Sequence, residues 1–163
     1  MTRRSMIKLT RIDDRLLHGQ VAFTWTPYLG VDTLLIANDK VAKDEFMKMT
    51  MGLAKPAGAR LLIKSLEGAA DLLCDAKSAN LKILVLVNSV KDAHALAADV
   101  PDITSLNFGG IRTREGARLV SKAVALTDDD ISLIKEMLEK GIELEIRQVP
   151  TDSKQMMKEL IEI

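Results

Sequence analysis

The 163-residue chain has little of what holds small secreted proteins together or anchors proteins in membranes. It contains one cysteine, Cys74, so no disulfide can form within it, and a lone thiol in an apolar helical stretch is typical of a reducing compartment. Its apolar runs, at 61–63 and 81–87, are far shorter than the roughly 20 residues that a membrane-spanning helix needs. The basic start is followed by Ile7-Lys8-Leu9 rather than by the apolar core of a signal peptide. We therefore expect a cytoplasmic chain that is not exported and does not itself span a membrane.

The chain also lacks an excess of charge of either sign. Lys plus Arg and Asp plus Glu each total 23, so no overall field draws the protein to nucleic acid or anionic lipid. Any partner must be recognised by a local feature. No Gly/Ser-rich or Pro-rich linker, internal repeat or low-complexity tract interrupts the sequence, which predicts a single domain over residues 1–163.

Short apolar or β-branched runs alternate with longer segments of helical period, and this alternation predicts parallel βαβ units. Several of the runs are apolar throughout, as expected for strands covered on both sides. We predict an α/β fold with an open, mostly parallel sheet and helices on both faces. The predicted strands are 6–12, 33–37, 60–63, 81–87, 104–106 and 143–148, and the predicted helices are about 17–28, 40–54, 66–78, 89–98, 128–140 and 152–161.

The most informative segment follows the first predicted strand and leads into a helix. It reads Arg11-Ile12-Asp13-Asp14-Arg15-Leu16-Leu17-His18-Gly19-Gln20-Val21. Open parallel sheets bind ligands at the carboxyl ends of their strands, where a helix N-terminus offers N–H groups to anions. Two arginines, two aspartates and a histidine in eight positions therefore mark this segment as the candidate site.

His18 suits transient phosphorylation, because a neutral imidazole is a nucleophile near pH 7 and the N–P bond that it forms stays reactive. A nearby arginine fork stabilises the charge on the phosphoryl oxygens in the transition state, a role for which we favour Arg15 over Arg11. The alternative is a solvated turn and helix cap with a surface histidine.

Three further residues of the segment have expected roles. A carboxylate that accepts the proton of one ring nitrogen leaves the other nitrogen free to attack, which suits Asp13 or Asp14. Gly19 clears space beside the ring for a second phosphorylated histidine.

The segment from Asn107 to Gly110 follows another predicted strand. Its glycines, Gly109 and Gly110, allow backbone N–H groups to turn toward an anion, so the segment is a candidate opposite wall of a phosphate pocket. An ordinary tight turn explains it equally well. Beyond it, Arg112, Arg114 and Arg118 form either a docking site for a protein partner or a solvated basic face.

The string from Arg11 to Val21 closely resembles the phosphorylation motif of the IIB components of the mannose, fructose and sorbose family of bacterial phosphoenolpyruvate-dependent sugar phosphotransferase systems. That motif reads Arg-Ile-Asp-Asp-Arg-Leu-x-His-Gly-Gln-Val. The resemblance continues through Asn107-Phe108-Gly109-Gly110 and 141–147, and so covers nearly the whole chain. It implies a mostly parallel sheet with helices on both faces.

The resemblance also implies an activity, that of a protein-Nπ-phosphohistidine–sugar phosphotransferase. His18 is expected to take phosphate on Nδ1 from the phosphohistidine of a IIA protein or domain. It is then expected to phosphorylate a sugar delivered by membrane IIC and IID subunits, which implies peripheral association with the inner face of the membrane. The sugar is left open among mannose, fructose, sorbose, glucosamine and N-acetylgalactosamine.

Two other classes of protein compete with this interpretation. A signalling receiver domain also has an acidic pair after its first strand, but it needs a phosphorylatable Asp at the end of a central strand. Here the third and fourth predicted strands are followed by Ser65 and by Asn88-Ser89. A nucleotide-binding module built around 107–110 lacks both common glycine-rich phosphate motifs.

The remaining candidate residues favour packing. The exception is His94, which is expected to be an exposed helix residue: it has no ligand cluster at metal-binding spacing, and we expect neither a metal nor a cofactor. Met47, Met49 and Met51 beside Phe46 are expected mainly in the core, and Trp25 and Tyr28 are expected to pack rather than to form a sugar platform. A homodimer is left open, because an apolar helix face can pack on its own sheet or on a second copy.

Overall fold

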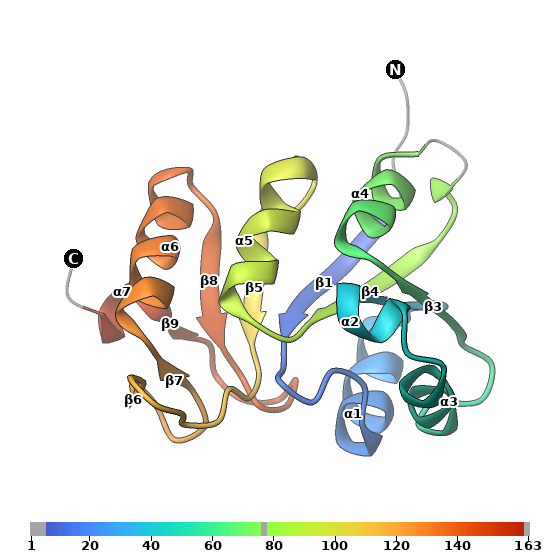
Figure 1. Ribbon diagram of the computed structural model, residues 1–163, viewed down its shortest axis with the longest axis horizontal. Helices are drawn as coiled ribbons and strands as arrows, with labels where there is room; N and C mark the ends of the chain where they lie inside the picture. Colours follow the sequence, from blue (N-terminus) through green and yellow to red (C-terminus); the bar gives the residue numbers. More distant parts are fainter. Residues whose placement is uncertain (1–5, 76–77, 162–163) are drawn as a thin grey trace.

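The computed structural model describes residues 6–75 and 78–161, and it has the predicted α/β architecture (Figure 1). Among these residues, seven strands form one sheet in the order β3-β2-β4-β1-β5-β8-β9, parallel throughout except for β9. The strands are β1 (Met6–Ile12), β2 (Thr33–Ala37), β3 (Arg60–Lys64), β4 (Lys82–Val87), β5 (Ser105–Phe108), β8 (Glu143–Ile146) and β9 (Gln155–Met156). A separate two-stranded hairpin pairs β6 (Arg118–Leu119) with β7 (Ala125–Leu126).

Helices cover both faces of the sheet, because alternate residues of its central strands are apolar on each side. Leu34 and Ile36 of β2 pack with α1 (Gly19–Leu29), α2 (Asp39–Ala42) and α3 (Glu45–Leu53). Leu35 and Ala37 face the side of α4 (Leu66–Cys74), α5 (Val90–Asp99) and α6 (Asp128–Glu139). The short α7 (Met157–Leu160) joins this second side through Met157. The prediction of helices on both faces is confirmed.

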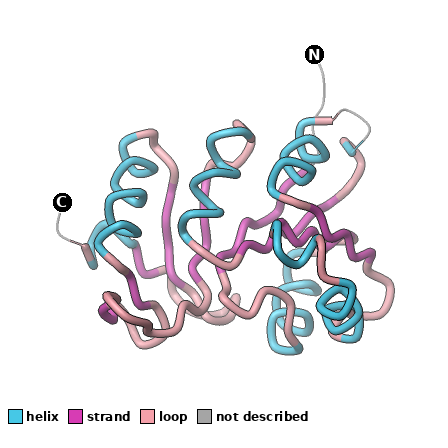
Figure 2. Tube along the Cα trace, in the orientation of Figure 1, coloured by secondary structure: helices cyan, strands magenta, loops and turns pink. Residues whose placement is uncertain are grey.

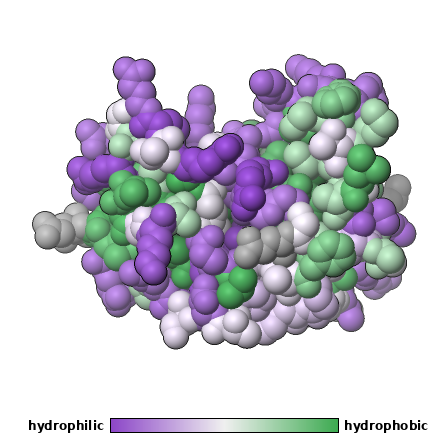
Figure 3. Space-filling model, turned by 90° about the horizontal axis from the view of Figure 1, so that it is seen from below, coloured by the Kyte–Doolittle hydropathy of each residue, from purple (hydrophilic) through white to green (hydrophobic). Residues whose placement is uncertain are grey.

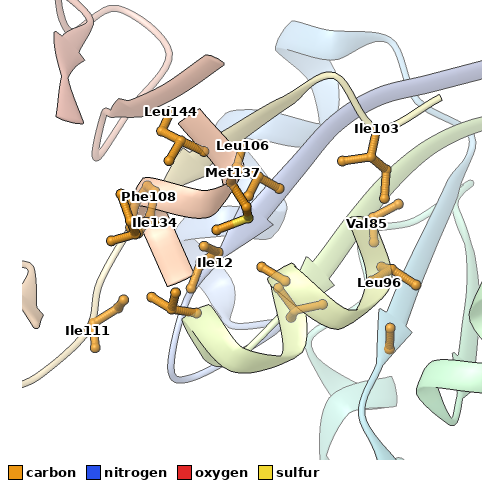
Figure 4. Packing of buried hydrophobic residues seen from close by; sticks show 14 of the residues in the cluster. Ile12, Val85, Leu96, Ile103, Leu106, Phe108, Ile111, Ile134, Met137 and Leu144 are labelled. Atoms are coloured by element: carbon orange, nitrogen blue, oxygen red, sulfur yellow. The ribbon is translucent and has the colours of Figure 1, made fainter. Parts of the chain in front are cut away.

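The larger core lies between the sheet and the second group of helices. Figure 4 shows Ile12, Leu106 and Phe108 of the sheet meeting Ile134 and Met137 of α6. Ile12 and Phe108 are fully buried at the carboxyl ends of β1 and β5. Tight packing therefore fixes the strand ends from which the candidate site starts.

The split between the two groups of helices follows from strand order. The chain moves from β1 to β2 and β3 in one direction, then returns past β1 through β4 to β5 and β8. Since parallel crossovers are right-handed, reversing the direction moves the connecting helices to the other face. The reversal lies between β1 and β5, and loops gather at that end of the sheet (Figure 2).

Most predicted elements are present, but the predicted helix at 40–54 is wrong as a single helix. It is divided into α2 and α3, because Asp44 starts a second helix by accepting the N–H of Met47 at 3.0 Å. The predicted helix at 17–28 begins two residues late, at Gly19. The predicted helix at 66–78 ends at Cys74, and its residues 76–77 lie outside the described part.

Two differences concern strands. The strand predicted at 104–106 extends through Phe108, so Asn107 lies within β5 rather than in a loop. The helix predicted at 152–161 is wrong over its first half, where β9 pairs with β8. Asp152 caps a turn instead, since its carboxylate accepts the N–H groups of Gln148 and Val149 at 3.1 and 3.3 Å.

The prediction that the methionine-rich segment packs in the core is only partly confirmed. Met51 is buried and Met47 partly buried, whereas Phe46 and Met49 are exposed. Figure 3 shows hydrophobic side chains gathered on the right of the lower face. The exposed large apolar residues of α1 and α3 are Phe23, Tyr28, Phe46, Met49 and Leu53.

Candidate functional site

The connection between β1 and α1, residues 13–18, lies where the strand order reverses. Its first residues are hydrogen-bonded to β4 and to the segment that follows β5. The Asp13 N–H donates to the Val87 carbonyl at 2.9 Å, and the Asp14 N–H donates to the Gly110 carbonyl at 2.8 Å. Such reversal points are where open α/β sheets bind ligands, as the sequence predicts.

The same connection contains the one non-glycine residue with positive φ in the described part of the chain. Leu16 has φ 58°, and its N–H donates to the Asp13 carbonyl at 2.9 Å. A leucine adopts this conformation only when its surroundings hold it there, and both Leu16 and Leu17 are buried against the sheet. The turn therefore presents the next residue, His18, from a fixed backbone.

His18 is the N-cap residue of α1, with extended backbone and a side chain that is 17% exposed. Its Nε2 lies 3.1 Å from Oδ2 of Asp13, whose side chain is buried. Because a carboxylate only accepts hydrogen bonds, this contact requires a ring proton on Nε2, and in the neutral imidazole Nδ1 then keeps its lone pair. The His18 side chain does not cap the helix, so it does not occupy the N–H groups of the first turn.

The structure separates the two aspartates that the sequence left as alternatives. Asp13 contacts His18 through Oδ2, while its Oδ1 accepts the backbone N–H of Arg15 at 3.1 Å. Asp14 instead accepts from the backbone N–H and the Nε of Arg112, at 2.8 and 3.0 Å. Asp13 is thus the carboxylate that orients the ring, and Asp14 joins the loop to residue 112.

Arg11 is buried and its guanidinium points into the protein. Nη1 donates to Oδ1 of Asn107 at 2.6 Å and to the Arg147 carbonyl at 3.0 Å, while Nη2 lies 3.5 Å from Asp13 Oδ2 and 3.3 Å from the Gln148 carbonyl. Burial lowers the pKa of Arg11, and the charges of Asp13 and Glu145 act in the opposite direction. Arginine nonetheless stays protonated in proteins. Arg11 therefore places a positive charge beside the Asp13 carboxylate, on the buried side of the loop.

Arg15 is exposed and lines a cleft of about 720 Å³ beside the loop. The cleft is also lined by Asp14, Gly110, Arg112, Lys122 and Gln148. An exposed guanidinium at the open side of the loop can reach an incoming anion. Both terminal nitrogens of Arg11 instead face protein acceptors, and its Nε is buried with no hydrogen-bond partner among the described residues. Arg15 stays the arginine that we expect to contact the phosphoryl group.

Gly19 is exposed, and a Cβ placed on it meets nothing within 4 Å. The space beside the start of α1 is open, so nothing inside the chain requires a glycine there.

The segment 107–110 is placed differently from the expectation of an exposed anion-binding loop. Asn107 is fully buried, with its oxygen bound to Arg11 and its Nδ2 donating to Oε1 of Glu145 at 2.9 Å. Neither Gly109 nor Gly110 has a positive φ, and the Gly109 N–H donates to the Ile12 carbonyl at 2.8 Å. A Cβ on Gly109 would lie 2.3 Å from Nη2 of Arg11, so this glycine provides room for the guanidinium. Gly110 does line the cleft.

Sequence reasoning missed the residues that surround Arg11 on its inner side. Glu145 is buried and holds Arg147 through two N–H groups, with Nε to Oε2 and Nη2 to Oε1 both at 3.0 Å. The alternation of Glu143-Leu144-Glu145-Ile146 indicated that Glu145 shares a face of the strand with Arg147. It did not indicate that this face is covered.

Trp25 is fully buried, which confirms its expected packing role, whereas Tyr28 is mostly exposed and touches Trp25 edge-on with ring centroids 6.2 Å apart. The guanidinium carbons of Arg11 and Arg147 each lie 5.1 Å from the Trp25 ring centroid. The indole N–H donates to the Gln148 carbonyl at 3.1 Å. Trp25 therefore belongs to the environment of the site rather than to its open surface.

The three downstream arginines do not form one cluster. Arg112 pairs with Asp14, Arg114 pairs with Asp130, and Arg118 is exposed in β6. His94 is half-buried and contacts Glu136 of α6 at 3.3 Å. Over residues 6–75 and 78–161, no group of three His, Cys, Asp or Glu side chains is arranged to hold a metal ion. In the same part of the chain, every helix is too short or too polar to cross a membrane.

The sequence of this chain is similar to those of known proteins along nearly its whole length. Residues 7–163 match the family described as PTS system sorbose subfamily IIB component. The chain is 36% identical over 163 residues to a probable phosphotransferase enzyme IIB component of Streptococcus pyogenes, covering 96% of this chain and 99% of that protein. It is 35% identical over 156 residues to the PTS system mannose-specific EIIAB component of Escherichia coli K12, of which it spans 48%.

Solved structures agree with the sequence relatives. The IIBSor domain of the sorbose permease from Klebsiella pneumoniae superposes with a TM-score of 0.90 at 30% identity, covering 95% of each chain. The N-acetylgalactosamine-specific IIB component 1 of Escherichia coli superposes with a TM-score of 0.86 at 30% identity, covering 93% of this chain and 99% of that one.

Proposed function

Because the chain belongs to the sorbose subfamily of IIB components of the sugar phosphotransferase system, we propose that it accepts a phosphoryl group on Nδ1 of His18 and passes it to a sugar. IIB components are phosphotransferases. In this proposal the donor is the phosphohistidine of a IIA protein or domain, and membrane IIC and IID subunits deliver the sugar. The observation that carries it is the 3.1 Å contact between His18 Nε2 and Asp13 Oδ2, which leaves Nδ1 as the nucleophile.

Each transfer exchanges one bond to phosphorus for another. In the first, the lone pair of His18 Nδ1 attacks phosphorus and the bond to the donor imidazole breaks. The His18 ring, now substituted on Nδ1 and protonated on Nε2, carries positive charge that the Asp13 carboxylate stabilises. In the second, a sugar hydroxyl attacks phosphorus, the P–Nδ1 bond breaks, and the hydroxyl proton passes to solvent or to a base of the membrane subunits.

The surroundings of His18 support the charge of the transferred group. The N-terminus of α1 directs backbone N–H groups and the positive end of the helix dipole toward this side of the loop. Arg15 at the open cleft supplies a guanidinium to the phosphoryl oxygens. Open space at Gly19 admits the donor histidine.

The remaining site residues have supporting roles in this proposal. Asp14 fixes Arg112 at the rim of the cleft, and Gly110 lines that cleft. Asn107 and Gly109 act through Arg11 rather than on phosphate directly. We place the protein in the cytoplasm, associated with the inner face of the membrane through IIC and IID.

Phosphorylation of the purified chain by a charged IIA donor tests the proposal. We expect one phosphoryl group per chain by intact mass spectrometry, stable in alkali and lost in mild acid, as for phosphohistidine. His18→Ala should accept none while keeping the wild-type fold, because the proposed nucleophile is removed. His94→Ala is the matched control and should be labelled as wild type.

Either of two results contradicts the proposal. One is normal labelling of His18→Ala. The other is a phosphoryl group that alkali also removes, which identifies an acyl phosphate on a carboxylate, as in a receiver domain.

A further inference from the structure

Three polar residues behind the site occupy one register row of the sheet. Arg11 of β1 is paired with Asn107 of β5, and Asn107 is paired with Glu145 of β8. All three are buried, with exposures of 2%, 0% and 2%. A buried polar row is stable only when its members satisfy one another, so their contacts fix how each can be oriented.

The amide of Asn107 is oriented by charge on both sides. Its Nδ2 donates to the Glu145 carboxylate at 2.9 Å, and its Oδ1 accepts from Arg11 at 2.6 Å. The opposite orientation would place two oxygens together on one side and two N–H groups together on the other. Glu145 therefore selects which end of the amide faces Arg11.

Arg11 in turn has little freedom to move. The Arg147 and Gln148 carbonyls accept from the two guanidinium nitrogens, the Trp25 ring lies against the group, and Gly109 leaves room only because it has no Cβ. The guanidinium is thus presented to Asp13 in one position. Its Nη2 lies 3.5 Å from the same Oδ2 that faces His18.

Contacts therefore run without interruption from Glu145 to His18. The distances along them are 2.9 Å to Asn107, 2.6 Å to Arg11, 3.5 Å to Asp13 and 3.1 Å to the ring. The first of these residues, Glu145, lies on β8, two strands from β1, and follows His18 by 127 positions in the sequence. The ring is thereby connected to a strand that carries none of the segment 11–21.

We propose that Asn107 and Glu145 are positioning residues for His18: they hold Arg11 so that Asp13 keeps Oδ2 on Nε2, and so they select Nδ1 as the unprotonated nitrogen. The consequence for phosphoryl transfer rests on the proposed function. The tautomer itself is a property of the chain alone, and it can be measured without a donor.

Nitrogen-15 NMR of the histidine rings in the full-length protein tests this inference. In the wild type at neutral pH, His18 should show one pyrrole-type Nε2 and one pyridine-type Nδ1. In Asn107→Leu, which keeps the size of the side chain but removes the amide, both signals should move toward the average of the two tautomers. The rate of phosphoryl acceptance should fall by up to about 100-fold, the loss that accompanies misplacement of a reacting group by an ångström.

A matched control separates positioning from stability. Asp130 is another buried carboxylate paired with an arginine, Arg114, but it lies on α6, away from the row. Asp130→Asn should lower the unfolding midpoint and leave the His18 signals unchanged. Asp130 and Glu145 are thus two buried carboxylates paired with arginines, of which only Glu145 is expected to affect the ring.

A folded Asn107→Leu protein with the wild-type tautomer and transfer rate overturns the inference. If Asn107→Leu does not fold, Glu145→Gln decides, because it is isosteric and removes the charge that orients the Asn107 amide and pairs with Arg147. A wild-type tautomer in that variant, or failure of both variants to fold, also overturns it. A wild-type chain with a single tautomer that accepts no phosphate contradicts the proposed function and leaves the positioning inference intact.

Discussion

On the sheet face covered by α1, α2 and α3, one row of residues paired across neighbouring strands is apolar in one half and polar or charged in the other. The row contains, in strand order, Ile36, Leu86, Arg11, Asn107 and Glu145. The first two are buried among leucines and Trp25, whereas the last three form the polar contacts behind His18. The change occurs at β1, the strand that leads to the site.

The opposite face shows that the fold does not require this change. The next row there contains Val87, Ile12, Phe108 and Ile146, and it is apolar from end to end. Apolar contacts stabilise without fixing direction, whereas hydrogen bonds between charged groups fix orientation at a cost in desolvation. The comparison teaches that apolar residues would be enough to stabilise the sheet at this position. The polar half instead orients the groups around the site.

The largest expected effect comes from removing the cation at the boundary between the halves. Arg11→Met should lower the free energy of unfolding by about 4 kcal/mol, because Asp13, Asn107 and two carbonyls lose their donor inside the protein. Urea denaturation measures this change. Arg60→Met on exposed β3 is the control and should stay within about 0.5 kcal/mol. Equal stability of the two variants would show that the polar half adds nothing to the fold.

A somewhat smaller loss is expected in the apolar half. Leu86→Ala should cost about 3 kcal/mol through lost burial and the cavity left behind. The rate of phosphoryl acceptance should not change at temperatures where the variant is folded, since no directional contact is broken. Leu53→Ala, at a side chain that is 85% exposed, is the control. A slower transfer rate in Leu86→Ala would break the distinction between the two halves.

The smallest of the three effects concerns two adjacent glycines. Gly109→Ala should cost about 2 kcal/mol by forcing Arg11 from its place, whereas a Cβ on Gly110 meets nothing within 4 Å and should be tolerated. Thermal unfolding of both variants measures the difference. Equal midpoints would indicate that the guanidinium moves aside without loss, and would weaken its role in holding Asp13.

Much of the architecture is predictable from the sequence, because apolar runs and helical periods are local signals. The runs that became β2 and β4 are apolar on both faces, which is enough to place them inside a parallel sheet. The position of His18 at the start of a helix follows from the same periodicity. The end of β5 and the strand β9 were not predictable in this way, since both depend on pairing with β8.

The candidate site was predictable only as far as residues close together in the chain. The segment from Arg11 to Gly19 places a histidine near carboxylates and arginines, but it does not say that Asp13 rather than Asp14 contacts the ring. That choice depends on the turn at Leu16. Asn107 was expected on a loop beside phosphate, whereas it is buried within β5. Glu145 was not identified at all, because the sequence does not show which residues pair with a charged side chain in a strand, and burial of that side chain depends on such partners.

Trp25 is the only indole in the chain, and it lies against the guanidinium groups of Arg11 and Arg147 with its ring shielded from water. Indole emission responds to nearby charge and to the polarity of its surroundings. The protein therefore contains a built-in optical probe, with no competing signal from another tryptophan, through which events at the loop can be followed by fluorescence in real time and without a label.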